Sequence, residues 1–261
     1  MVLTESDVHP PTVRIGATVA EAAEAAAERA AAGILAALAA RGSARVLFAS
    51  APSQEAMLAR LGADSRIDWS LVHSFHLDEY VGLPASAPQS FGQWLQDRLP
   101  AAALPGFVRM HAEDEAGVIA EIERYSTLIG EAPVDVTCLG IGVNGHIAFN
   151  EPGVSDLDDR DRARQVDLDL ASRQQQVDEG LFPTLADVPT SAITLTVPAV
   201  TGARMLVCTV LGSHKAQAVA GALEGPIGAD CPGSLMQAHP EAYWFLDEAA
   251  AGQLRRQHPG R

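Results

Sequence analysis

The sequence has few cysteines and few basic residues. Its three cysteines, Cys138, Cys208 and Cys231, are isolated, odd in number and not spaced like metal ligands. They are typical of small buried thiols in a reducing cytoplasm. With 18 basic against 33 acidic residues, the formal net charge of −15 produces a field that repels nucleic acid and anionic lipid. An anionic substrate therefore needs a local basic pocket.

Other features are also missing. No apolar run approaches membrane-spanning length, and the start, "MVLTESDVHPPTVRIG", has no basic stretch followed by an apolar one. No Pro/Gly/Ser-rich linker divides the chain, and no repeat is evident. The histidines are scattered, and the acidic run "DLDDRD" lacks the glycine and terminal glutamate of a calcium loop. We expect one domain over residues 1–261 in the cytoplasm, without a metal ion, a nucleic-acid partner or a membrane.

The order of apolar and helical segments indicates the fold class. The Ala-rich stretch 18–42 predicts a long helix, because Thr18 and Glu21 form a capping-box pattern and Gly42 suits the far end. Further helix-like segments lie around residues 53–61, 90–98, 114–129 and 213–223. Between them come the apolar runs "RVLFAS", "SLVHSFHLD", "FVRM", "VDVTCLG", "SAITLT", "ARMLVCTVLG" and "AYWFLD". This alternation predicts an α/β fold, a doubly wound and mostly parallel sheet with helices on both faces (Rossmann-like).

One segment departs from that alternation. Between about residues 153 and 187 the chain is polar, mixed in charge and too long for an ordinary connection. It is either a mobile lid over a site or a solvated surface helix, and the sequence does not separate the two.

Polar clusters follow four of the predicted strands directly, at residues 50–54, 78–80, 144–151 and 213–215. Because the carboxyl ends of parallel strands share one edge of a sheet, where ligands of doubly wound folds bind, the clusters should converge. Asp78 and Glu79 have a second interpretation, since acidic residues after a strand often cap the next segment.

The stretch "CLGIGVNGHIAFNEPG" carries the strongest chemical signal. A lone histidine such as His146 is often a core residue, but a carboxylate at Glu151 can orient its ring and favour a proton shuttle. Asn144 either adds a hydrogen-bonding partner or forms a turn with Gly145. Gly142 and Gly145 let backbone amides approach a ligand, yet "GIGVNG" lacks the last glycine of the dinucleotide fingerprint. We therefore expect no nicotinamide cofactor, and proton transfer needs none.

Two cations could serve an anionic ligand. Lys215 follows Gly-Ser at a predicted helix start, where free amides and the helix dipole favour an anion such as a sugar phosphate. Arg173, in the polar segment, is either a bidentate clamp on the same anion or an ordinary surface arginine.

At these residues the sequence resembles the glucosamine-6-phosphate deaminase (isomerase) family, which shares a superfamily with the 6-phosphogluconolactonases. "FHLDEYVGLP" and "LGIGVNGHIAFNEPG" are similar to that family's two signature motifs. "LGSHKAQAVAGALEG" and "CPGSLMQAHPEAYWFLDEAA" resemble its C-terminal portion, and the resemblance covers about residues 18–250.

The resemblance implies a set of catalytic roles. Asp78 would remove the C2 proton of an open-chain amino sugar. His146, held by Glu151, would open the sugar ring by moving a proton onto the ring oxygen, and Asn144 occupies the position of an accompanying acidic residue. The resemblance further implies that Lys215 and Arg173 bind the phosphate and that residues 153–187 form the lid. The family is often oligomeric, so a homo-oligomer is an expectation.

The chain also departs from the family pattern. Where the family has a Thr-Gly-rich phosphate loop, this chain reads "ASAPSQ", whose Pro52 removes an amide donor. Side-chain donors from Ser50, Ser53 and Gln54 can substitute. "AITLTVPAV" likewise has Thr196 and Pro198 where the family usually has small glycines near the sugar.

These departures leave the outcome of the reaction open. The remodelled loop favours loss of C3 water from N-acetylglucosamine 6-phosphate, a dehydration. The alternative is isomerising deamination of glucosamine 6-phosphate to fructose 6-phosphate and ammonia, and a weaker alternative is a non-catalytic sugar-phosphate sensor.

Overall fold

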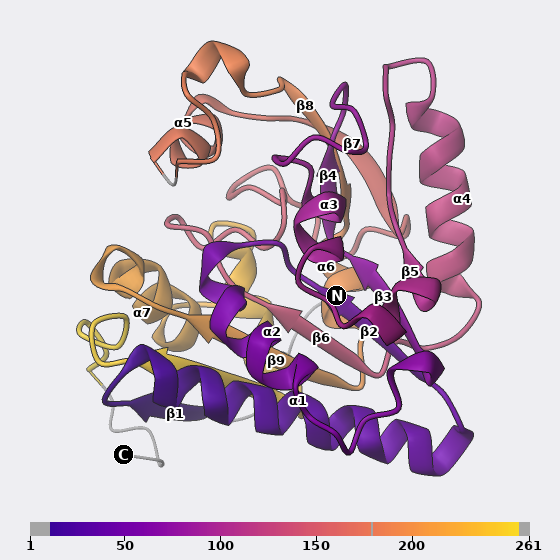
Figure 1. The fold of residues 1–261 in the computed structure, drawn as a ribbon. Helices are drawn as coiled ribbons and strands as arrows, with labels where there is room; N and C mark the ends of the chain where they lie inside the picture. Colours follow the sequence, from indigo (N-terminus) through magenta and orange to yellow (C-terminus); the bar gives the residue numbers. More distant parts are fainter. Residues whose placement is uncertain (1–10, 179, 256–261) are drawn as a thin grey trace.

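The fold is built on a seven-stranded sheet. The structure, a computed structural model, describes residues 11–178 and 180–255. All pairings in this sheet are parallel, which confirms the predicted architecture (Figure 1). The strands, in spatial order, are β1 (Thr12–Gly16), β10 (Ala242–Asp247), β9 (Met205–Val210), β6 (Val136–Leu139), β2 (Ala44–Phe48), β3 (Val72–His76) and β5 (Phe107–Val108).

A second, three-stranded antiparallel sheet was not expected. It contains β4 (Asp78–Tyr80), β8 (Ser191–Leu195) and β7 (Ala163–Asp167), in that order. The prediction that the run "SAITLT" belongs to the parallel sheet is therefore wrong, because this run forms β8. All five residues of β8 are buried, and a short strand that is buried throughout does not reveal from its sequence whether its neighbours run parallel or antiparallel.

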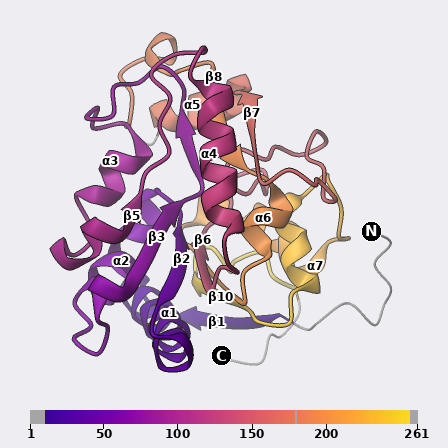
Figure 2. The same cartoon turned by 90° about the vertical axis from the view of Figure 1, so that its right-hand side faces the viewer.

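Helices cover both faces of the large sheet, as predicted (Figure 2). On one face α1 (Val19–Arg41) and α2 (Glu55–Gly62) pack with Val46 and Phe48 of β2. On the other face α4 (Val118–Gly130), α6 (Val197–Thr201) and α7 (Ala216–Glu224) share a core with Leu47 of the same strand. Alternate side chains of β2 thus enter opposite cores, as a strand buried on both faces requires.

The polar segment 153–187 has regular structure. It contains β7, which pairs with β8, and the helix α5 (Leu170–Asp178). The remaining helix, α3 (Phe91–Gln96), falls inside the helical segment expected at residues 90–98. Of the helices in the described part of the chain, none combines the length and the apolar character that crossing a membrane requires.

Helix α1 has the Thr18 cap predicted from sequence, although the Glu21 carboxylate accepts from the Ala17 N–H and not from the Thr18 N–H that a capping box requires. The Thr18 side chain accepts a hydrogen bond from the Glu21 N–H, and Gly42 ends the helix in the left-handed region at φ +75°. Its buried face is mostly alanine, so the helix lies close to the sheet. At Gly33 a Cβ atom would be 2.7 Å from Val136 Cγ2, so the helix depends on a glycine there.

Gly33→Ala should therefore destabilise the protein. The helix gains about 1 kcal/mol of propensity, but overpacking against β6 costs about 1–3 kcal/mol, so we expect a net loss of about 1 kcal/mol in urea unfolding. Combining it with Val136→Ala removes the clashing methyl group, so the two changes should be less than additive. Full additivity of the two losses would contradict this packing argument.

Candidate active site

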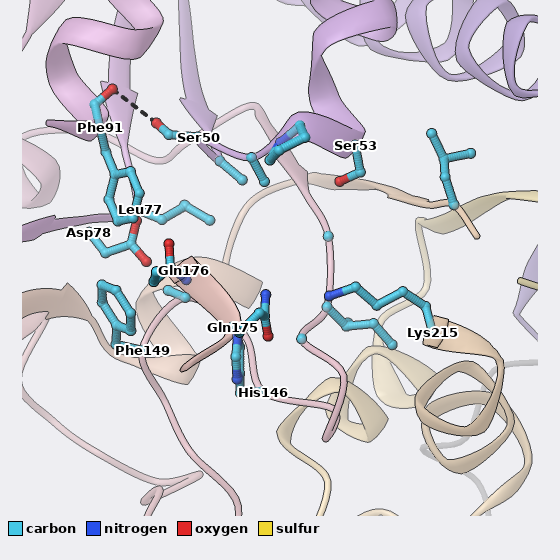
Figure 3. Close-up of a pocket in the computed structure, with 18 of the residues that line it drawn as sticks. Ser50, Ser53, Leu77, Asp78, Phe91, His146, Phe149, Gln175, Gln176 and Lys215 are labelled. Carbon is cyan, nitrogen blue, oxygen red and sulfur yellow. Dashed lines mark hydrogen bonds between the residues drawn. The ribbon is translucent and has the colours of Figure 1, made fainter. Parts of the chain in front are cut away.

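The four polar clusters converge at one cavity. The strands β9, β6, β2 and β3 are neighbours in the sheet, and the chain leaves the carboxyl end of each toward a cavity of about 410 Å³. This convergence was predicted, and Figure 3 shows it. Six of the predicted site residues line the cavity: Ser50, Ser53, Asp78, Gly142, His146 and Lys215.

Asp78 lies at one side of the cavity, in strand β4 rather than in a loop after β3. Leu77, Phe91 and Phe149 also line this side, and Figure 3 shows them around the carboxyl group. Within residues 11–178 and 180–255, no group donates a hydrogen bond to the Asp78 carboxyl. Burial, together with the nearby charge of Glu79, raises the pKa of Asp78 to about 8. A carboxyl group in this environment is a strong base whenever it is ionised.

His146 and Glu151 form the pair expected from sequence. His146 Nδ1 lies 3.1 Å from Glu151 Oε1, and both side chains are largely buried. Glu151 also accepts hydrogen bonds from Asn144 Nδ2, at 2.7 Å, and from Ser172 Oγ. Burial alone would raise the pKa of Glu151, but the interactions with His146, Ser172 and Asn144 outweigh burial and lower that pKa to about 2. Glu151 therefore stays anionic and lies against the imidazole. Neither Glu151 nor Asn144 lines the cavity.

The loop around His146 requires glycine at two positions, Gly142 and Gly145. A Cβ atom at Gly142 would lie 2.2 Å from His146 Cε1, so the ring packs directly on this glycine. Gly145 has φ +88°, and a Cβ atom there would lie 2.6 Å from Cys231 Sγ. Gly142 lines the cavity, whereas Gly145 serves the turn that carries His146.

The other side of the cavity is cationic. Lys215 ends the short turn before α7, and Figure 3 shows its ammonium group directed into the cavity, on the side where Ser53 lies. His214 lines the same side. Ser50 Oγ donates a hydrogen bond of 3.1 Å to the Phe91 carbonyl, so its hydroxyl proton is already used. The cavity therefore has an apolar side around Asp78 and a basic side at Lys215.

Three predicted substrate-binding side chains do not line the cavity. Gln54 is fully buried, and its amide donates to the carbonyls of Leu139 and Thr209, where it ties β6 to β9. Glu79 accepts hydrogen bonds from the backbone of Tyr80, Phe91 and Gly92 and from the Ser90 hydroxyl, and so anchors the start of α3. The capping interpretation of Glu79 fits these contacts.

Arg173 is the third. Its Nη2 donates to the carbonyls of Leu185 at 2.6 Å and Val188 at 2.9 Å, so it holds the loop after α5 instead of reaching the cavity. The sequence does not show which backbone carbonyls the fold brings beside an arginine. It therefore could not separate this structural contact from the predicted clamp on an anion.

Three residues of α5 belong to this site and were not predicted from sequence. Gln175 and Gln176 line the cavity, and Ser172 donates to Glu151. They share one helical face, because residues three and four apart are neighbours on a helix. That spacing was the available signal. In the described residues no group of His, Cys, Asp and Glu side chains could hold a metal ion.

Comparison with known proteins agrees with this geometry. Residues 17–244 match the family described as glucosamine-6-phosphate isomerases/6-phosphogluconolactonase. The chain belongs to this family. It is 36% identical over 193 residues to a glucosamine-6-phosphate deaminase of Streptococcus equi subsp. zooepidemicus, covering 73% of this chain and 80% of the relative. A Streptococcus sanguinis glucosamine-6-phosphate deaminase is 36% identical over 198 residues, covering 74% of this chain and 80% of the relative.

Solved structures of the family have the same fold. A monomeric glucosamine-6-phosphate deaminase superposes with a TM-score of 0.83 at 27% identity, over 92% of this chain and 99% of the other. A putative 6-phosphogluconolactonase from Neisseria gonorrhoeae gives a TM-score of 0.72 at 19% identity, over 91% and 100%. At that lower identity the second likeness concerns the fold alone.

The raised pKa of Asp78 predicts a pH-dependent cost to folding in this family member. Below pH 3.8 the carboxyl is neutral in both the folded and the unfolded chain, and between pH 3.8 and about pH 8 it ionises in the unfolded chain first. Wild-type stability should therefore fall, relative to Asp78→Asn, across that window. We expect the variant's advantage in free energy of unfolding to grow by on the order of 2–4 kcal/mol between pH 4 and pH 8.

Urea unfolding at a series of pH values measures this advantage. Asp97→Asn is the matched control, since it makes the same substitution at an exposed position at the end of α3, away from the cavity. A difference between wild type and Asp78→Asn that does not change with pH would contradict the buried-carboxyl interpretation.

Proposed function

We propose that this chain catalyses the isomerising deamination of glucosamine 6-phosphate to fructose 6-phosphate and ammonia. One observation carries the proposal: Asp78 and the Glu151-backed His146 line the same cavity, whose other side holds Lys215. The identity to named glucosamine-6-phosphate deaminases over about three quarters of the chain supports the same reaction.

The proton transfers follow from the two environments. His146, oriented by anionic Glu151, moves the proton of the C1 hydroxyl onto the ring oxygen, so the bond between C1 and the ring oxygen breaks and the sugar opens to its aldehyde form. Asp78, as the carboxylate, takes the C2 proton and returns it at C1. A proton also passes from the C2 amine to the C1 oxygen, and the amino aldose becomes a ketimine. Water then adds at C2 and ammonia leaves, giving the ketose. Between the two transfers Asp78 holds the proton, and its apolar surroundings stabilise this neutral form.

The phosphate is proposed to bind at the basic side of the cavity. Lys215 and the Ser53 hydroxyl supply donors there, in place of the amides that a glycine-rich loop offers. Arg173 remains a proposed phosphate ligand, and to reach the site it must release the carbonyls of Leu185 and Val188. Such a release requires movement of residues 153–187, which we propose to act as the lid.

The wider setting is also part of the proposal. We infer one domain in the cytoplasm that acts on a small phosphorylated amino sugar without a metal ion or cofactor, with a homo-oligomer as an expectation from the family. A non-catalytic sugar-phosphate sensor is a weaker interpretation, because binding alone does not require a buried carboxyl group such as Asp78 or an imidazole paired with a carboxylate, as in His146 and Glu151.

A second candidate reaction is loss of C3 water from N-acetylglucosamine 6-phosphate. Two observations favour it: Leu77, Phe91 and Phe149 give the Asp78 side an apolar surface suited to an acetyl methyl group, and Pro52 lies in the remodelled loop. An acetamido group does not leave by the ketimine route, so after C2 proton removal the C3 hydroxyl is the available leaving group.

Incubation with each sugar phosphate separates the two reactions. From glucosamine 6-phosphate we expect fructose 6-phosphate and an equal amount of ammonia. Asp78→Asn should lower this rate by on the order of 10³-fold, because general-base catalysis contributes about 10²–10⁴-fold. Asp97→Asn should leave the rate unchanged. An unsaturated, ultraviolet-absorbing product from the N-acetyl sugar, without ammonia from the free amine, would refute deamination in favour of dehydration. Binding of both sugars without turnover would support the sensor.

A further inference from the structure

The point where the chain crosses from one sheet to the other lies directly beside Asp78. β3 ends at His76 and β4 begins at Asp78, so Leu77 alone separates the parallel sheet from the antiparallel one. Asp78 pairs with Thr194 of β8, and the Leu77 carbonyl accepts from the Leu195 N–H at 2.8 Å. The direction of the Asp78 side chain is therefore set by how this crossing is held.

Both ring nitrogens of His76 hold the crossing. Its Nε2 accepts from the Met110 N–H at 2.7 Å, and a backbone N–H can only donate. The ring proton therefore lies on Nδ1, which donates to the Asp78 carbonyl at 2.8 Å. His76 is fully buried, and burial lowers its pKa to about 3, so the ring stays neutral at physiological pH.

Helix α4 holds the same crossing from the other side of the chain. The His76 N–H donates to the Tyr125 hydroxyl at 2.8 Å, and that hydroxyl donates to the His76 carbonyl at 2.9 Å. β5 pairs only with Ser74 and Phe75, so the phenol takes the place of a neighbouring strand at the end of β3. The backbone N–H and C=O of His76 are therefore both hydrogen-bonded to Tyr125, which fixes the backbone just before Asp78.

We propose that His76 is a positioning residue for Asp78, because its Nδ1–H holds the Asp78 carbonyl while Met110 holds the ring. The inference rests on the proposed function for what Asp78 does. His76 is neutral and adds no charge, so it acts through geometry. The titratable groups near the Asp78 carboxyl are Glu79 on its own strand, Tyr125 on α4 and His146 across the cavity.

Two amide substitutions separate the two ring hydrogen bonds. In His76→Asn the amide nitrogen takes the place of Nδ1 and can still donate to the Asp78 carbonyl. In His76→Gln the amide reaches the place of Nε2 and can accept from the Met110 N–H, but the bond to Asp78 is lost. Each variant keeps one of the two buried hydrogen bonds that the His76 ring makes. If His76 only stabilises the fold, the two variants should have similar urea unfolding midpoints and similar activities.

The positioning role predicts a difference between the variants. We expect His76→Gln to lower kcat for glucosamine 6-phosphate on the order of 100-fold with KM nearly unchanged, because a displacement of about 1 Å costs that much. His76→Asn should stay within about threefold of wild type, since its carbonyl contact is kept. Equal kcat losses in both variants would overturn the inference.

A second measurement needs no substrate and so does not depend on the proposed reaction. In the protein labelled with ¹³C at aspartate carboxyls, Asp78 should titrate near pH 8 in wild type and in His76→Asn, and at lower pH in His76→Gln, where it gains solvent. In ¹⁵N-histidine-labelled wild type, the His76 ring should carry its proton on Nδ1 from pH 5 to pH 9. A proton on Nε2, or an Asp78 titration identical in all three proteins, would overturn the inference, whichever sugar the enzyme uses.

Discussion

The constraint on which the structure depends is the burial of one carboxyl group, Asp78, where the chain passes between two sheets. The large parallel sheet can bring four strand ends together, but residues that follow a strand in a connecting segment are generally more mobile than the strand itself. By entering a second sheet at once, the chain fixes Asp78 through backbone pairing with β8 on one side and through His76 on the other. Asp78 thus lies on a strand, which is a more rigid support than a loop.

Two carboxyl groups in this site have opposite properties because their surroundings differ. Asp78 has no donor within the described residues and lies among apolar side chains, so its pKa is raised. Glu151 is also buried, but Asn144, Ser172 and the His146 ring stabilise its charge and lower its pKa. Two carboxyl groups whose pKa values are shifted in opposite directions are suited to two roles. One can serve as a base that holds a proton, and the other as a permanent anion that orients an imidazole. Ser172 also connects α5 to that anion by a hydrogen bond. A movement of α5 would therefore change the position of Glu151 beside His146.

Much of the fold could be predicted because its signals are local. The cap at Thr18, the glycine at Gly42 and the apolar runs of the central strands each depend on neighbours in sequence, and strand-end polarity indicated the convergence of the site. The small sheet could not be predicted, because three residues at Asp78–Tyr80 make too short a pattern and β8 is buried throughout. Gln54, Glu79 and Arg173 have polar side chains of the right kind, but most of their partners are backbone groups that only the fold brings close.

The central claim is that Asp78 and Lys215 act on opposite ends of one sugar phosphate. A crystal structure with the open-chain analogue 2-amino-2-deoxyglucitol 6-phosphate tests it most directly. We predict that the amino-bearing carbon lies against the Asp78 carboxyl, with the phosphate beside the Lys215 ammonium group and the Ser53 hydroxyl. An analogue bound with its phosphate at the Asp78 side, or in a different cavity, would contradict the account.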